Sequence, residues 1–187
     1  QFYDGDMCSV AAFHNPAARS LLSGVSLPSG NTASAALEAV LDSIMAHQNV
    51  APFVSRHLIQ QLVTSNPSPA YVQRVAGAFS AGRHGRLGTG RKGDLAATVA
   101  AVLLDAEARS TTVASSAGRL REPIQLFTGV LRALNGRTDG EALGWWWGEE
   151  MRQHVFRPPS VFNFYSPDYP VAGTALVGPA FGIHNAN

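Results

Sequence analysis

A stiff polar corner, Asn66-Pro67-Ser68-Pro69, lies between two stretches in which apolar residues recur at helical spacing. Pro67 biases Asn66 toward extended backbone and Ser68 is a good helix cap. Pro69 fits the first turn of a helix, where its missing N–H has no partner to lose. We therefore expect one helix to end at this corner and a second to begin there, at a fixed angle to the first.

Helical periodicity of about 3.6 residues recurs in five segments of the chain and predicts an all-α fold. The expected helices begin at Thr32 or Ser34, near Val50, at the corner, at about Asp94 and near Arg121, and a shorter one spans 141–154. After them, "FRPPSVFNFYSPDYP" holds too many prolines for a helix or a central strand. We expect an orthogonal bundle of about six helices with an extended aromatic C-terminal strap and essentially no sheet.

The domain organisation expected from these patterns is one helical domain over 1–187. It has an irregular lead-in (1–31), a helical core (32–155) and the strap (156–187). Because the chain starts at Gln1 rather than methionine and ends on "GPAFGIHNAN", we expect it to be part of a longer protein. One apolar face should then be bare, and another protein chain or the missing N-terminal part should cover it.

Composition narrows the classes of partner. The net charge of +1 provides no extended basic field, so we expect no nucleic-acid partner. No apolar run approaches the roughly 20 residues of a transmembrane segment, and a lone Cys8 forms no internal disulfide. The six histidines do not fall into metal-ligand spacing, and neither do Glu149, Glu150 and His154, so we expect no metal and no cofactor.

His57 and Gln61 are polar residues on the predicted inward side of the helix before the corner. A buried imidazole needs hydrogen-bond partners, and the segments expected to supply them are Arg121–Pro123 and the strap around Asn163. We expect His57 to be mostly buried and bonded to one of these segments, in an architectural junction rather than an active site. The candidate junction residues are His57, Gln61, Asn66, Arg121, Glu122 and Asn163.

Two other segments are candidates for binding. Trp145, Trp146 and Trp147 point three ways from a helix, so at least one should face solvent or a partner, although core packing is the simpler role. With Tyr165 and Tyr169 they form a candidate partner or sugar surface. The segment "AGRHGRLGTGRKGD" is expected to be a mobile, exposed loop, since it lacks the preceding strand and the GK[ST] ending of a phosphate-binding loop.

Four motifs in order carry a family resemblance: "NVAPFVSRHLIQQLVTSNPSPAYVQRVAGAF", "KGDLAATVAAVLLDAEAR", "GRLREPIQLFTGVLRA" and "PPSVFNFYSPDYP". They resemble the bacterial domain-of-unknown-function family 1800, from about Phe13 to the end of the chain. The resemblance implies a mostly helical protein that is exported to the periplasm or the extracellular space. Members commonly have a His-Asp pair in the lead-in, whereas this chain has His14 followed by Asn15.

Two classes of function are compatible with these patterns. The first is a structural or interaction component of an envelope or extracellular assembly, which suits the aromatic segments. The alternative is a hydrolase-like or carbohydrate-active enzyme whose site is completed by a missing N-terminal part. The sequence contains no Gly-x-Ser-x-Gly nucleophile elbow.

Overall fold

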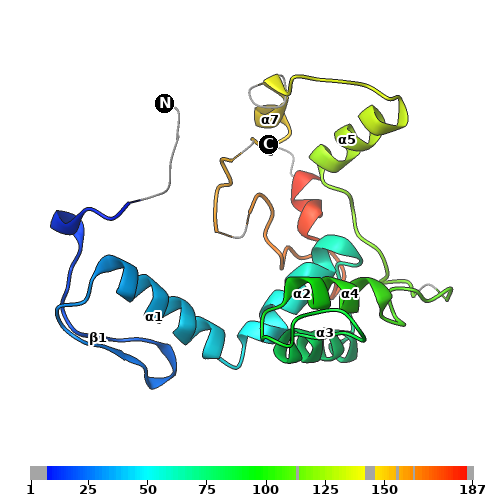
Figure 1. The fold of residues 1–187 in the computed structure, drawn as a ribbon. Coiled ribbons are helices and arrows are strands. Elements are labelled where there is room, and N and C mark those ends of the chain that lie inside the picture. Colours follow the sequence, from blue (N-terminus) through cyan, green and yellow to red (C-terminus); the bar gives the residue numbers. More distant parts are fainter. Residues whose placement is uncertain (1–7, 113, 142–145, 155, 162, 185–187) are drawn as a thin grey trace. The chain divides into compact units, whose positions relative to one another are not determined.

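The computed structural model describes residues 8–112, 114–141, 146–154, 156–161 and 163–184 (Figure 1). The chain divides into two compact units, residues 1–53 and 54–187. Helices dominate, which confirms the mainly α class predicted from the sequence. The helices are α1 (Ala33–Ala46), α2 (Val50–Leu62), α3 (Pro69–Ala81), α4 (Leu95–Leu104), α5 (Pro123–Ala133) and α7 (Trp146–Glu150), with short 3-10 helices η1 (Ala11–Phe13), η2 (Leu22–Gly24) and η3 (Pro179–His184).

The lead-in of the first unit contains a small hairpin that the sequence analysis missed. Strands β1 (Arg19–Ser20) and β2 (Ser26–Leu27) pair antiparallel, with Arg19 opposite Leu27. Ser23 and Gly24 both have positive φ, 58° and 75°, and reverse the chain between the strands. The lead-in expected to be irregular therefore contains a short hairpin, and the Ser-Gly dipeptide was the local signal for its turn.

Helix α1 begins at the earlier of the two predicted caps. The side chain of Thr32 accepts a hydrogen bond from the Ala35 N–H at 3.2 Å. Ser43, which is buried, donates to the carbonyl of Leu22 at 2.6 Å and holds η2 against α1. The large apolar residues Leu37, Leu41 and Ile44 of α1 are exposed.

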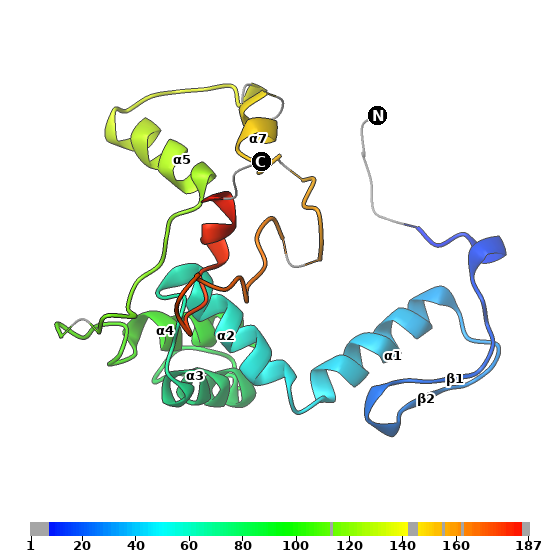
Figure 2. The ribbon, with the colours of Figure 1, turned by 180° about the vertical axis from the view of Figure 1, so that it is seen from behind.

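The core of the second unit lies where α2, α3 and α4 meet, and Figures 1 and 2 show α3 and α4 side by side. Ser68 caps α3 by accepting from the Tyr71 N–H at 3.1 Å, and Pro69 is the first residue of α3, as the corner predicts. The hydroxyl of Tyr71 donates to the carbonyl of Val102 at 2.5 Å and joins α3 to α4. The buried cluster comprises Ile59, Tyr71, Val75, Ala78, Ala101 and Val102.

An ion pair also joins α3 to α4. Asp105 follows the last residue of α4, where the helix dipole disfavours a negative charge. The Arg74 guanidinium compensates with two hydrogen bonds of 2.7 Å to its carboxylate, and the Glu107 N–H donates a third at 2.8 Å. Chiefly through the Arg74 hydrogen bond, the pKa of Asp105 is held below its ordinary value.

We expect Asp105→Asn to lower the free energy of unfolding by about 2 kcal/mol at neutral pH, because charge-assisted hydrogen bonds to a buried carboxylate are lost. A depressed pKa stabilises the fold above the ordinary pKa near 4, and that stability is lost as the pH falls through the folded-state value. Urea unfolding at neutral and acidic pH should therefore show a smaller acid loss in the variant. Asp168→Asn is the matched control, since its pair with Arg56 is exposed and should change stability little.

The glycine-rich loop between α3 and α4 is exposed, as predicted, and its backbone closes on itself. Gly82 ends α3 in the left-handed conformation, and its carbonyl accepts from the Gly90 N–H at 2.9 Å. The Asp94 carboxylate caps α4 through the Ala97 N–H and also accepts from the backbone and hydroxyl of Thr89. These bonds hold the two ends of the loop together.

The C-terminal segment 156–187 departs in part from the extended strap predicted for it. In its described part, Pro170 and Val177 form an isolated antiparallel bridge, and the chain then coils into η3. Phe156 is almost fully exposed, whereas Phe164, Tyr165 and Tyr169 are half-buried. Phe162, counted among the strap aromatics, lies outside the described residues.

Candidate functional site

The corner between α2 and α3 binds two distant segments of the chain. The Asn66 side chain donates to the carbonyl of Val177 at 2.8 Å and accepts from the Val177 N–H at 2.9 Å. On the preceding turn, the Thr64 hydroxyl both donates to the carbonyl and accepts from the N–H of Gly118, at 3.2 and 3.1 Å. The corner is therefore a junction of three chain segments, built largely on side chain to backbone bonds.

The amide that α2 buries is Gln60, and the prediction for Gln61 is wrong in this respect. Gln61 is exposed, whereas Gln60 is only 3% exposed and donates to the carbonyls of Ser65 and Pro167 at 3.1 and 3.3 Å. The predicted inward side of this helix was the side of its large apolar residues Val50, Val54, Leu58 and Leu62. The buried face is instead lined by Ala51, Ser55 and Ile59. Each of these residues follows one residue of the predicted face, so the buried face is rotated by about 100° around the helix axis.

His57 is half-buried, and its Nε2 atom is shielded from solvent. The C-terminal segment reaches α2 near this residue through Pro167, bonded to Gln60, and Asp168, paired with Arg56 at 3.2 Å. Arg121 and Asn163 are both exposed. That His57 serves architecture rather than catalysis stays a prediction.

Glu122 takes part in a second junction, which the sequence did not reveal. Gln153 follows α7 and is buried, and its side-chain oxygen Oε1 accepts a hydrogen bond from the Ile124 N–H at 2.9 Å. Its amide nitrogen donates to the Glu122 carboxylate at 2.8 Å. Gln153 thus satisfies the first turn of α5 from outside that helix and ties α7 to it.

We expect Asn66→Ala to release the C-terminal segment from the corner. Both bonds to Val177 are lost, and we expect the free energy of unfolding to fall by about 2 kcal/mol. The measurement is amide hydrogen exchange at Val177, which should accelerate in the variant. Gln61→Ala, in the last turn of α2, is the matched control, because loss of an exposed amide should affect neither stability nor exchange. Unchanged exchange at Val177 in Asn66→Ala would contradict the prediction.

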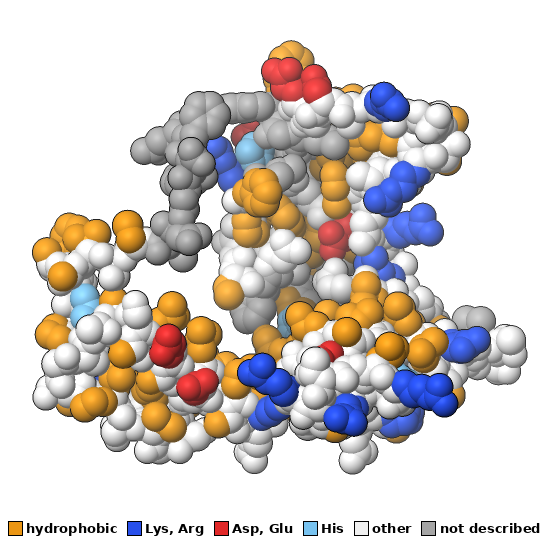
Figure 3. All heavy atoms as spheres, in the orientation of Figure 1, with side chains coloured by type: hydrophobic (Ala, Val, Ile, Leu, Met, Phe, Trp, Pro, Cys, Tyr) orange, Lys and Arg blue, Asp and Glu red, His pale blue; other side chains and the backbone are white. Residues whose placement is uncertain are grey.

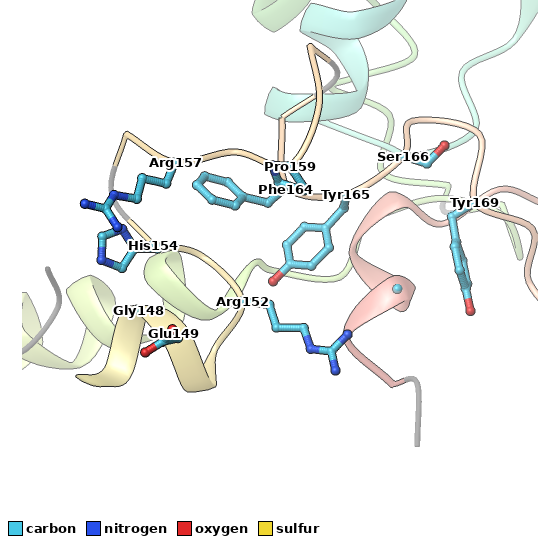
Figure 4. Close-up of a pocket in the computed structure, with 11 residues that line it drawn as sticks. Gly148, Glu149, Arg152, His154, Arg157, Pro159, Phe164, Tyr165, Ser166 and Tyr169 are labelled. Atoms are coloured by element: carbon cyan, nitrogen blue, oxygen red, sulfur yellow. The ribbon is translucent and has the colours of Figure 1, made fainter. Parts of the chain in front are cut away.

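The described tryptophans and tyrosines of the predicted partner or sugar surface have different surroundings, and that they form one binding surface stays a prediction. Trp146 is 79% exposed, and Trp147 packs edge-on against Phe127 of α5 with ring centroids 5.0 Å apart. Trp145 lies outside the described residues. Tyr165 and Tyr169 instead line a pocket of about 440 Å³ (Figure 4).

This pocket is formed by the end of α7, the turn that follows it, the C-terminal segment and η3. Its lining residues are Gly148, Glu149, Arg152, His154, Arg157, Pro159, Phe164, Tyr165, Ser166, Tyr169 and Gly182. The Tyr165 hydroxyl donates to the carbonyl of Met151 at 3.2 Å. Burial, and secondarily the charge of Glu122, raises the pKa of Tyr165 to about 12, so it remains a neutral donor at physiological pH.

In the described part of the chain, no group of three or more His, Cys, Asp or Glu side chains gathers in a way that could hold a metal ion. None of the helices in the described ranges is long and apolar enough to cross a bilayer.

The structure defines a mainly α-helical protein. Its corner joins segments more than a hundred residues apart, at Asn66 and Val177, and its pocket is lined by residues between Gly148 and Gly182. Residues 2–178 match the sequence model of a family described as a protein of unknown function, DUF1800, and the chain belongs to this family. This confirms the resemblance carried by the four motifs. No curated protein and no solved structure is significantly similar to the chain.

Proposed function

We propose that this chain is an interaction component of an exported bacterial assembly, and that a partner protein binds the apolar face of α5. The observation that carries the proposal is the exposure of Leu126 and Val130, which lie on one side of α5, and of Leu134, the residue that follows its last turn. Figure 3 shows hydrophobic side chains beside arginines in the region of α5. Helices with such a stripe commonly dock into an apolar groove of another protein.

The α5 face is held in place by its neighbours, which favours binding. Gln153 satisfies the start of α5, and the contact of Phe127 with Trp147 attaches α7 alongside it. A preformed face loses less conformational entropy on association than a flexible one. The exposed Trp146 on α7 adds an aromatic side chain of the kind enriched at the centres of interfaces. Export is supported by the family resemblance alone.

Site-specific photo-crosslinking in cells of the native host tests this proposal. A crosslinking amino acid at position 126 or 134 should capture one defined protein of the envelope fraction, whereas the same amino acid at Arg86, in the loop after α3, should not. With the purified pair, Leu126→Glu and Val130→Glu should each weaken binding at least about tenfold. Crosslinks to a second copy of this chain, or to no partner, would contradict the proposal.

The enzymatic alternative has its own readout. Purified protein would be assayed on panels of polysaccharides and esters, with and without divalent metal. Turnover that disappears in His57→Ala, while urea unfolding of the variant is unchanged, would defeat the interaction proposal. Absence of turnover together with a specific crosslink from α5 would support it.

A further inference from the structure

The exposed side of α5 carries two neighbouring rows of residues. The apolar row consists of Leu126, Val130 and Ala133. The row beside it consists of Gln125, Gly129 and Arg132, each one residue before a member of the apolar row. The members of a row are separated by three or four residues, about one helical turn, so each row runs along the helix axis.

Three arginines lie along this second row. The Arg119 guanidinium donates a hydrogen bond of 2.5 Å to the side chain of Gln125, in the first turn of α5. A Cβ atom at Gly129, in the middle of the helix, would lie 4.0 Å from Nη1 of Arg121. Arg132 belongs to the last turn. The start, the middle and the end of the row therefore each have a guanidinium group, and Figure 3 shows Lys and Arg side chains beside hydrophobic ones in the region of α5.

These guanidinium groups are not neutralised within the described part of the chain. None of the ion pairs between described residues involves Arg119, Arg121 or Arg132. The carboxylate nearest to them in sequence, that of Glu122, accepts a hydrogen bond from the amide of Gln153 at 2.8 Å. The row of arginines thus leaves one border of the apolar row positively charged.

The opposite border of the apolar row is formed by α7. Phe127, on the side of the apolar row away from Gln125, packs against Trp147 of α7 with ring centroids 5.0 Å apart. Helix α7 ends on Glu149 and Glu150. Because like charges repel, these carboxylates disfavour acidic groups of a partner on this side. The acidic groups of a partner therefore fit along the arginine border alone.

Resting on the function proposed above, we infer that the partner binds α5 through an amphipathic helix with an acidic row along one border. Its apolar residues pack on Leu126 and Val130, and its carboxylates pair with the guanidinium groups, whose paired N–H donors match two carboxylate oxygens. Gly129 makes the row beside them low, and a ridge of side chains on a second helix fits such a groove. A lipid bilayer presents no ridge, and its anionic headgroups are repelled by the carboxylates of α7.

The test uses two synthetic peptides of roughly 20 residues, long enough to form a helix. Both have a row of leucines, and one has glutamates beside this row where its twin has lysines. In fluorescence anisotropy titrations with the purified protein, the glutamate peptide should bind at least about tenfold more tightly than the lysine peptide. The difference should shrink as salt is added, because exposed charges are screened.

Variants locate this preference on α5. Arg132→Gln should weaken binding of the glutamate peptide several-fold, and Arg121→Glu combined with Arg132→Glu should reverse the preference. Gly129→Leu fills the groove and should weaken binding of both peptides, whereas Gly129→Ala, whose Cβ atom meets nothing closer than 4.0 Å, should preserve it. Arg86→Glu, at an exposed arginine in the loop after α3, is the matched charge control and should bind like the parent protein. Thermal unfolding establishes that each variant is folded, and Arg132→Gln decides the question if the double variant does not fold.

Several outcomes would overturn the inference. These are equal binding of the two peptides, no binding of either, or an equal loss in Arg86→Glu. Binding to phosphatidylglycerol vesicles that disappears in the double variant would instead assign the arginines to a membrane surface.

The crosslinking experiment separates this inference from the function on which it rests. The segment of the partner that is crosslinked from position 126, sequenced by mass spectrometry, should contain several Asp or Glu residues among apolar ones. A defined partner crosslinked through a segment without acidic residues would contradict this inference and leave the proposed function standing. Absence of any crosslinked protein would contradict the proposed function itself.

Discussion

Replacing Gly82 by alanine is expected to lower the free energy of unfolding by about 3 kcal/mol or more. Gly82 has a φ of 62°, and a Cβ atom there would lie 2.1 Å from the carbonyl oxygen of Arg91. Left-handed backbone costs a non-glycine residue about 1–2 kcal/mol, and forcing the chain apart adds about 1–3 kcal/mol. The obstacle is backbone on the opposite side of the loop, so no side-chain rotation relieves it. Urea unfolding provides the measurement.

Two glycines nearby separate the contributions to this effect. Gly85 also has a positive φ, 58°, but nothing lies within 4 Å of an added Cβ atom, so Gly85→Ala should cost only about 1 kcal/mol. Gly77 lies inside α3 with open space around it, so Gly77→Ala should stabilise the protein by about 0.5–1 kcal/mol. Equal losses of unfolding free energy in Gly82→Ala and Gly85→Ala would show that the close approach of Gly82 to the backbone of Arg91 does not determine the effect.

Tyr71→Ala is the second substitution expected to have a large effect, about 3–5 kcal/mol, because Tyr71 is completely buried among α2, α3 and α4. Tyr71→Phe isolates the hydroxyl. The carbonyl of Val102 lies in the last turn of α4, where helical carbonyls lack partners within the helix, and Tyr71 supplies one. Losing that bond should cost about 1–3 kcal/mol. A Tyr71→Phe variant as stable as the parent protein would contradict this account.

Because of Tyr71, we also expect the free energy of unfolding to depend on pH in the alkaline range. Burial, followed by the charges of Asp105 and Glu107, raises its pKa from 10.0 to about 12. Because the raised value favours the neutral phenol in the folded state, this stabilisation is complete below about pH 10 and is lost as the pH rises toward 12. Tyr165 contributes in the same range. Unfolding free energies measured between pH 9 and about 12 should therefore fall less steeply in Tyr71→Phe than in the parent protein.

The features predicted most accurately from the sequence are the helix ends, which depend on capping residues and prolines close to them in the chain. The corner at Asn66–Pro69 predicted the end of one helix and the start of the next. Thr32, Ser68 and Asp94 were recognisable as residues that favour helix starts, and all three act as caps. Caps and prolines act within three or four residues of their own position, so a single sequence is enough to recognise them.

Features that depend on distant partners were not predictable in the same way. Which face α2 buries depends on how closely α3 and α4 approach, and Ser55 and Gln60 are buried although their chemistry resembles that of surface residues. Gln153 satisfies α5 from beyond α7, with no sequence pattern linking the two. The pocket likewise combines residues from 148 to 182, whose convergence follows from the path of the C-terminal segment.

Asn66 has a consequence for how the family can vary in sequence. Its side-chain amide bonds to both the N–H and the carbonyl of Val177, presenting a donor and an acceptor as a neighbouring β-strand would. The two bonds therefore involve only backbone atoms of residue 177 and do not depend on its side chain. Any residue with a backbone N–H can form the same two bonds. Substitutions can accumulate there while the attachment persists, and proline alone is excluded by the bond itself.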